Sequence, residues 1–165
     1  MTRKLLYTTA VVLLPIGIAL ASGPPQGKEG LWSVNRQTID SPGNKKDVSP
    51  VIKICRNHAY DEYVFGLAKN IHGCTTVSES TQGNKYFVEL KCVVGKTVID
   101  TKGTTTFQGD TSGHSASHTT YTPPMFGQSE STMITDSKYI GSCPAGMQPG
   151  DRINVDGTIA HGWKH

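Results

Sequence analysis

The sequence lacks the short motifs by which several kinds of enzyme and metal protein are recognised. No G-x-S-x-G nucleophile elbow occurs, and no two cysteines stand at the C-x-x-C spacing of a zinc knuckle or a thiol–disulfide oxidoreductase. No pattern brings two carboxylates together as an acid–base pair. These absences disfavour a hydrolase or a metal-dependent enzyme, and we expect neither catalysis nor a cofactor.

A long apolar run is also missing after residue 20. The run at residues 5–20 follows two basic residues and ends near Ala19-Leu20-Ala21, which has the small-x-small pattern of a signal-peptidase site. The alternative is a membrane anchor, but the run is shorter than the roughly 20 residues that a spanning helix needs. We therefore expect residues 1–21 to be a signal peptide, the mature protein to be periplasmic or secreted, and no stable membrane span to remain.

The mature chain has no marked excess of charge of either sign. Removal of the predicted signal peptide takes away Arg3 and Lys4 and no acidic residue, which lowers the formal net charge from +3 to about +1. A basic patch or a basic amphipathic stretch would be needed to bind nucleic acid or a membrane surface electrostatically. We therefore expect no nucleic-acid partner.

Four cysteines follow the predicted cleavage site, at Cys55, Cys74, Cys92 and Cys143. An even number of cysteines behind an export signal predicts disulfides rather than a metal site or a reactive thiol. Gly83 is expected at the centre of a three-residue hairpin loop, and Cys74 and Cys92 each lie nine residues from it. The two would then face each other across the ladder, at a β-carbon separation close to that of a disulfide. The remaining pair is Cys55 with Cys143.

The order of local patterns predicts a mainly β (α+β) fold. After a flexible lead-in at 22–29, apolar residues alternate in strand-like runs, and helical spacing appears once, after a possible N-cap at Asn57. The helical apolar stripe is expected to face the core. Short Gly- and Pro-rich links favour antiparallel neighbours. We predict one domain at 30–151, an antiparallel, curved meander sheet with one packed helix and two disulfides, followed by a C-terminal tail at 152–165. The end of this tail, residues 161–165, has no predicted partner for His161 and is frayed by default, unless Trp163 packs on the domain. The expected strands are 31–39, 51–55, 86–94, 97–107, 113–121 and 131–140, and the stripe is Ala59, Tyr60, Tyr63, Val64, Leu67 and Ala68.

A set of landmarks recurs in an order that is typical of one family. They are Gly30-Leu31-Trp32 at the start, Cys55 before a helix, Cys74 and Cys92 around a hairpin, Phe107-Gln108-Gly109-Asp110, the segment from Tyr139 to Pro144, and Pro149-Gly150-Asp151. In these features the chain resembles the secreted bacterial proteins of domain-of-unknown-function family 3617, which start with Gly-Leu-Trp and end with aromatic-x-Gly-x-Cys-Pro. The resemblance covers about residues 30–151. It implies an envelope or secreted location and a shared fold, and it implies no activity.

Two histidines invite a metal hypothesis. His114 and His118 are four residues apart among Gly, Ser and Thr, a composition that favours a strand. On a strand the two share a face but stand roughly 13 Å apart, which is too far for one zinc ion. We therefore predict two solvent-facing histidines and no metal site.

Aromatic residues supply the candidate binding surface. Trp32 and Tyr121 fall on predicted strands whose inner face is either core beneath the helix or the wall of a ligand cavity. Met125 and Phe126 follow two prolines at a predicted loop tip, where apolar side chains have little structural reason to be. These four residues form the predicted binding surface, for an unknown protein or an apolar small molecule.

Three functions remain in view. The first is a non-catalytic, exported binding or structural module of the bacterial envelope. The second is a small carrier of an apolar or lipid-like ligand, held in a cavity between sheet and helix. The third is a hydrolase or metal-dependent enzyme. A cavity beneath the helix would favour the second, and converging titratable side chains in one cleft would favour the third.

Overall fold

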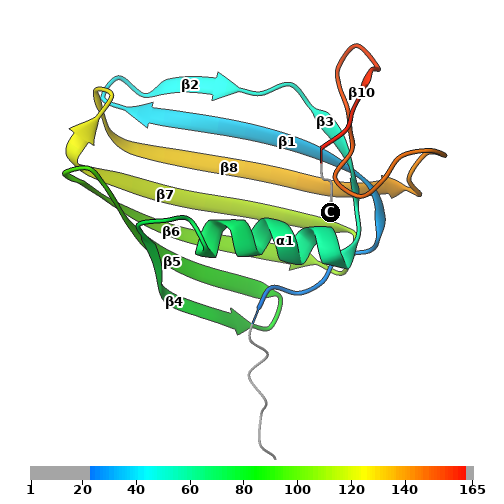
Figure 1. The fold of residues 1–165 in the computed structure, drawn as a ribbon, viewed down its shortest axis with the longest axis horizontal. Coiled ribbons are helices and arrows are strands. Elements are labelled where there is room, and N and C mark those ends of the chain that lie inside the picture. The colour runs from blue at the N-terminus through cyan, green and yellow to red at the C-terminus, as the bar shows by residue number, and fades with distance from the viewer. Residues whose placement is uncertain (1–22, 163–165) are drawn as a thin grey trace, which may run out of the picture.

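Antiparallel strands dominate the protein. The computed structural model describes residues 23–162, so the predicted signal peptide at 1–21 lies outside the described residues. The helix α1 (His58–Lys69) follows the third strand (Figure 1). The strands are β1 (Gly30–Ser41), β2 (Lys45–Val48), β3 (Ile52–Arg56), β4 (Cys74–Gln82), β5 (Lys85–Val94), β6 (Thr97–Gln108), β7 (Ser112–Met125), β8 (Gln128–Gly141), β9 (Arg152–Ile153) and β10 (Ile159–Ala160).

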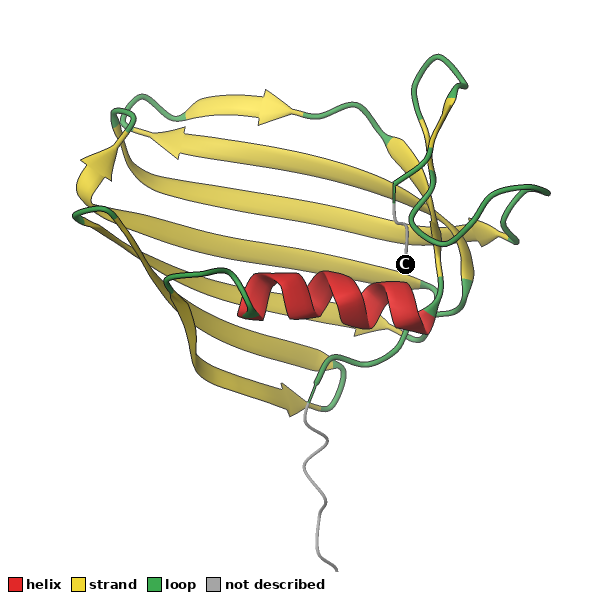
Figure 2. Ribbon diagram, viewed as in Figure 1, coloured by secondary structure: helices red, strands yellow, loops and turns green. Residues whose placement is uncertain are grey.

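All the strands join one antiparallel sheet. Its order is β10-β9-β3-β1-β8-β7-β6-β5-β4, and β2 pairs with the C-terminal half of β1. Strands β4 to β8 form a meander of consecutive neighbours, and β8 then pairs with β1. The sheet curves, and α1 lies over its concave face (Figure 2). The predicted curved antiparallel sheet with one helix is confirmed.

The topology explains why a helix crosses the concave face. Strands β3 and β4 are consecutive in the chain, but β1, β8, β7, β6 and β5 lie between them in the sheet. The connection must therefore pass over the sheet, and α1 is the ordered part of that connection. Asn57 caps the helix as predicted, because its side-chain oxygen accepts the backbone N–H of Tyr60 at 2.8 Å. Within residues 23–162, no helix has the length and apolarity that crossing a bilayer requires.

The apolar stripe of the helix faces the sheet only in part: Tyr60 and Val64 line the space between α1 and the sheet, whereas Tyr63 and Leu67 are about half exposed. Tyr63, Val64 and Leu67 are 44%, 41% and 49% exposed. The side that faces the sheet carries Phe65, whose ring lies 5.9 Å from that of Tyr86 on β5.

The rotation of α1 has an electrostatic cause. Arg56, at the end of β3, donates two hydrogen bonds of 2.8 and 2.9 Å to the carboxylate of Asp61. Residues four apart share a helix face, so this ion pair turns Asp61 and Phe65 inward together. Of the predicted stripe, Tyr63 and Leu67 consequently lie toward solvent, while Tyr60 and Val64 remain on the side that faces the sheet.

The two faces of the sheet differ in side-chain size. The register places small residues at the centre of the concave face, where Thr135, Ser115 and Thr105 are directly opposed on β8, β7 and β6. Cross-strand hydroxyl pairs run along this face, with Thr105 and Ser115 at 2.8 Å and Thr101 and Thr119 at 3.0 Å. The convex face carries charged pairs such as Lys102 with Glu89. The concave face therefore presents little volume to the helix above it.

Both predicted disulfides are confirmed, and the reason for one differs from the prediction. Cys55 bonds Cys143, and Cys74 bonds Cys92. The hairpin has a two-residue turn, because Gln82 pairs with Lys85, and not the predicted three-residue loop. On that register alone, Cys74 would not oppose Cys92. An irregularity between Thr76 and Ser78 shifts the register by one residue and brings the two cysteines opposite each other.

The C-terminal tail has partners as far as residue 162, although fraying was the default expectation from residue 161; Trp163, the residue expected to pack if the tail is ordered, lies outside the described residues. Arg152 and Ile153 pair with β3, and β10 pairs with β9. Asp151 is only 2% exposed. Its carboxylate accepts the backbone N–H groups of Gln148 at 2.8 Å and Gly162 at 3.3 Å, and it lies 3.1 Å from the His161 ring. The Gln148 N–H, followed by the His161 side chain and the Gly162 N–H, lowers the pKa of Asp151.

We predict that the longer disulfide contributes more to stability. The Cys55–Cys143 link spans 88 residues and the Cys74–Cys92 link spans 18. Loop-closure entropy assigns them about 4.6 and about 3.2 kcal/mol. Urea unfolding of the Cys55→Ser/Cys143→Ser and Cys74→Ser/Cys92→Ser variants should therefore show the larger loss for the first pair. Equal losses of stability, or a larger loss for the Cys74→Ser/Cys92→Ser variant, would contradict this prediction.

We predict a stabilising charge at Asp151. Because its pKa lies below the ordinary value of 3.8, its contribution is present above about pH 4 and is lost as the pH falls through its folded-state pKa. Asp151→Asn should lower the Tm at pH 7, and the difference from the parent should shrink toward pH 3. Asp47→Asn, on the exposed strand β2, is the matched control and should leave the Tm unchanged at both pH values. A difference that is constant with pH would rule out the charge as its source.

Candidate functional site

A cavity of about 720 Å³ separates α1 from the concave face of the sheet. Strands β6, β7 and β8 supply its floor, β1 and β3 supply one wall, and α1 forms its roof. The lead-in residues 23–27, predicted to be flexible, lie along its rim. This volume falls in the range of small-molecule sites, about 300–1,000 Å³.

The cavity exists because the floor is built from small side chains. Thr105, Ser115, Thr135 and Ser137 line it, and their hydroxyls add little bulk. Gly113 lies beside them, where a β-carbon would come within 3.2 Å of the Ser137 hydroxyl. Roof and floor therefore do not meet across the centre of the sheet.

One wall of the cavity is built around a buried aromatic ring. Trp32 is 3% exposed, and its ring meets that of Tyr139 edge to face at 6.1 Å. The Trp32 indole N–H donates to the Lys28 carbonyl at 2.8 Å, which satisfies its polar atom. The register puts Ile54 beside Trp32. The other apolar lining residues are Val34, Ile52, Val64, Phe65 and Phe107.

The charged groups beneath the start of the helix hold the roof in place. The Arg56 guanidinium that binds Asp61 also lies 4.5 Å from the centre of the Trp32 ring. The His58 backbone N–H donates to Glu29 at 3.1 Å, and its ring nitrogen lies 3.0 Å from the Gly27 carbonyl oxygen. Together these contacts fasten the N-terminal turn of α1 to β3 and to the lead-in.

The tyrosines near the cavity are neutral hydroxyl groups at physiological pH. Burial, and then a hydrogen bond with Glu79, raises the pKa of Tyr86. Burial also raises the pKa of Tyr60, although the positive charges of Arg152 and Arg56 lower it in part. Since an ordinary tyrosine titrates near 10, both phenols stay protonated at pH 7. Tyr60, which lines the cavity, therefore presents a neutral phenol there, whereas the Tyr86 hydroxyl is engaged with Glu79.

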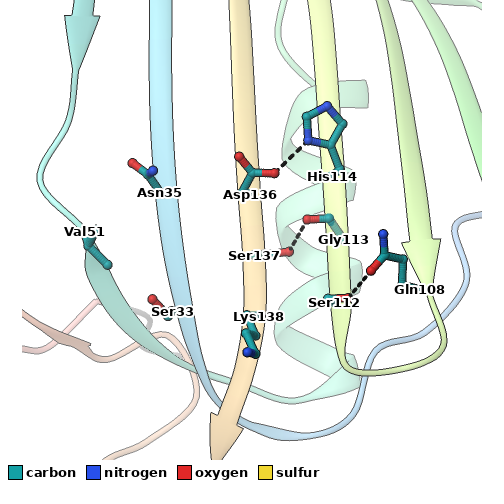
Figure 3. A pocket seen from close by; sticks show the side chains of 10 residues that line it. All are labelled: Ser33, Asn35, Val51, Gln108, Ser112, Gly113, His114, Asp136, Ser137 and Lys138. Atoms are coloured by element: carbon teal, nitrogen blue, oxygen red, sulfur yellow. Dashed lines mark hydrogen bonds and ion pairs between the residues drawn. The ribbon is translucent and has the colours of Figure 1, made fainter.

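His114 and His118 lie on the convex face, away from the cavity. Figure 3 shows His114 beside Asp136 over a shallow pocket of about 250 Å³. The two side chains are 2.7 Å apart, whereas the His118 ring bonds Thr132 at 3.2 Å. Among the described residues, no group of three or more His, Cys, Asp or Glu side chains is placed to hold a metal ion. Each histidine thus has its own separate partner.

The four residues of the predicted binding surface do not form one surface. Trp32 lines the cavity. Tyr121 lies on β7, eight residues beyond the lining residue Gly113, so Gly113 and Tyr121 are roughly 26 Å apart at about 3.3 Å per residue. Met125 is half-buried at the end of β7, and Phe126, in the β7–β8 turn, is 97% exposed. Trp32 alone among the four lines the cavity.

Sequence reasoning missed the cavity floor and two arginines. Arg36 and Arg152 both line the cavity, together with Thr135 and Ser115. The signal for the floor is the repeated Ser and Thr of residues 97–121, which indicates an exposed face as readily as an unfilled one. Arg152 was not predicted to line the cavity because its segment was interpreted as a C-terminal tail and not as a strand.

The architecture defines the class of the protein: a disulfide-linked, curved antiparallel sheet whose concave face is roofed by one helix and holds an open cavity. The chain belongs to the family DUF3617, described as a protein of unknown function, whose family model matches residues 27–143. That match begins at the cavity rim and ends at the last cysteine. No curated protein matches the chain.

We predict that Phe65, and not the apolar stripe, anchors the roof. Phe65→Ala removes the ring contact with Tyr86 and should lower the free energy of unfolding by about 1–2 kcal/mol. Leu67→Ala, on the exposed side of α1, is the matched control and should cost about 0.5 kcal/mol or less. Urea unfolding measures both. A larger loss for Leu67→Ala would mean that the stripe faces the sheet.

Proposed function

We propose that the protein is an exported, non-catalytic binding protein that holds a small molecule with an apolar body in the cavity beneath α1. The observation that carries this proposal is the cavity of about 720 Å³, whose lining includes the buried residues Trp32 and Ile54. Sites of this kind are mostly apolar with a few placed polar groups. The mixture of aliphatic and aromatic walls with a hydroxyl floor fits that description.

The unfilled floor favours a carrier over a purely structural module. Close packing stabilises a domain, and each missing side chain in an interior reduces that stability. Larger apolar residues in place of Thr135 and Ser115 would join the roof to the floor. A chain that served only as a structural element would gain from such residues, whereas a carrier needs the space.

The polar groups of the cavity favour binding over catalysis. Arg56 and Asp61 pair with each other, and the His58 ring is engaged with the lead-in. A general base must lie within hydrogen-bond reach of the proton it removes, and it must be free to accept that proton. These three groups are occupied in holding the roof. We therefore place the enzyme alternative last.

Export is supported by the sequence and by the covalent structure. The basic start, the apolar run and the small-residue site of residues 1–21 are typical of a signal peptide. Two disulfides in the folded chain fit an oxidising compartment outside the cytosol. We propose the periplasm or the extracellular space as its location.

A protein-binding role at the β7–β8 turn is the second candidate. Phe126 is 97% exposed and takes a positive φ of 52°, which is unfavourable for a bulky residue. An exposed aromatic side chain in such a position is a candidate contact for a partner. This role would be independent of the cavity.

We predict that filling the floor abolishes ligand binding. Thr135→Phe places a ring in the cavity and should weaken binding of the neutral fluorescent probe N-phenyl-1-naphthylamine at least about tenfold. The matched control Thr104→Phe puts the same ring on the convex face, since Thr104 opposes Ala116 there, and should bind as the parent does. Thermal unfolding checks that both variants fold.

Two results would count against the carrier. Failure of the parent protein to bind the probe would remove the proposed function. Loss of probe binding in Phe126→Ser, with retention in Thr135→Phe, would transfer the binding site to the β7–β8 turn. Native mass spectrometry of protein purified from its own compartment should in addition find a bound small molecule.

A further inference from the structure

We propose that the ligand is an amphiphile whose anionic head group, a carboxylate or a phosphate, is held by Arg36 and Arg152. This inference rests on the proposed function and assigns the polar end of the same cavity. Its apolar chain would lie across the sheet toward Phe107 on β6, along the lining already described.

The sheet register places both arginines on the concave face. Arg152 on β9 opposes Ile54, which in turn opposes Trp32. Arg36 lies two positions beyond Val34 on β1 and opposes Thr135 on the cavity floor. Both arginines line the cavity, from the β1–β3–β9 side of the sheet. The apolar pair Val34 and Ile52 lies between them on the same face.

The two guanidinium groups are free to bind an anion. Among residues 23–162, no carboxylate lies within ion-pair distance of Arg36 or Arg152. Arg56, the third arginine of the cavity, is by contrast already bound to Asp61 and packed on Trp32. Arginine in a cavity with no acidic partner is suited to bidentate binding of a carboxylate or a phosphate.

The other charged groups of the cavity lie elsewhere. Glu62 belongs to the roof, and Asp110 belongs to the β6–β7 turn. The Lys28 backbone N–H donates to the Asp110 carbonyl at 2.7 Å, so this turn lies beside the lead-in. Among the described residues, neither carboxylate is within ion-pair distance of Arg36 or Arg152, and these two unpaired cations lie on β1 and β9. An anionic amphiphile would therefore be oriented with its head group at the β1–β9 side.

Tyr60 adds a hydroxyl group on the same side. It lines the cavity from the roof, and the positive charges of Arg152 and Arg56 partly offset the rise that burial causes in the pKa of its phenol. A protonated phenol donates a hydrogen bond, and a head-group oxygen accepts one. The head group would thus meet two guanidinium groups from the sheet and one hydroxyl from the helix.

The test compares two ligands that share a chain and differ in charge. Dodecanoate and 1-dodecanol are titrated against protein loaded with N-phenyl-1-naphthylamine, and displacement of the probe gives the affinity of each. The parent protein should bind dodecanoate more tightly than dodecanol. Arg36→Gln and Arg152→Gln should each weaken dodecanoate binding about tenfold or more and leave dodecanol binding unchanged.

A matched control isolates the position of the charge. Lys53 lies on β3 between Ile52 and Ile54, and its exposed side chain belongs to the opposite face, where it opposes Ser33. Lys53→Gln removes one positive charge from the same strand region without touching the cavity. It should bind both ligands as the parent does, and raised salt should weaken dodecanoate binding alone.

The outcomes separate the head-group site from the cavity itself. Equal binding of dodecanoate by the parent and both arginine variants, or an equal loss in Lys53→Gln, overturns the head-group assignment and leaves the proposed function standing if dodecanol still binds. Displacement of dodecanoate, but not of dodecanol, by millimolar inorganic phosphate alone would identify a free-anion site and would also overturn it. Absence of binding by the probe and by both ligands would instead overturn the proposed function.

Discussion

Two disulfides fix the ends of the segment that crosses the concave face, and the rest of the structure depends on that constraint. Cys55 stands at the end of β3, just before α1, and is linked to Cys143 after β8. Cys74 opens β4, just after the helix, and is linked to β5. Each end of the roof is therefore covalently attached to the sheet, so the roof does not need a packed core beneath it to stay in place.

That arrangement allows the interior to be unusually poor in large side chains. Few side chains are buried, and the apolar ones include Leu31, Cys55 and Met147, which pack around the Cys55–Cys143 link and not beneath the helix. Beneath the helix, polar and ring contacts replace apolar packing, chiefly Arg56 with Asp61 and Phe65 with Tyr86. Covalent links compensate for a small core in many exported domains. Here they also permit an empty space at the centre.

The elements and the disulfides were predictable from sequence because they depend on local rules. Strand alternation, the Asn57 cap and an even number of cysteines each follow from short stretches of chain or from simple counting. The orientation of α1 about its own axis was not predictable in this way, because it also depends on the Arg56–Asp61 pair, which forms across a turn and lies on the same helix face as Phe65.

The cavity lining could not be predicted from the sequence, for the same physical reason. A run of serines and threonines looks the same on a solvated face as on the floor of a cavity, and the difference depends on where the crossing helix lies. Arg152 enters the cavity through the pairing of a two-residue strand with β3, and so short a strand leaves little trace in composition. The pairing of Cys74 with Cys92 was likewise predicted correctly but for a different reason, because the irregularity near Val77 shifts the strand register by one residue.

The irregularity near Val77 has a further consequence, for edge-to-edge association between copies of the protein. Among the described residues, β4 and β10 are the terminal strands of the sheet, and a third, short edge is β2, which pairs with β1 alone and carries Lys45 and Lys46. A long, flat margin invites strand addition from a second molecule. The interruption in β4 disturbs the spacing of its outward N–H and C=O groups, and β10 has just two residues. These two edge strands are thus poor templates for strand addition and fibril formation, which suits a protein whose sheet has an open concave face.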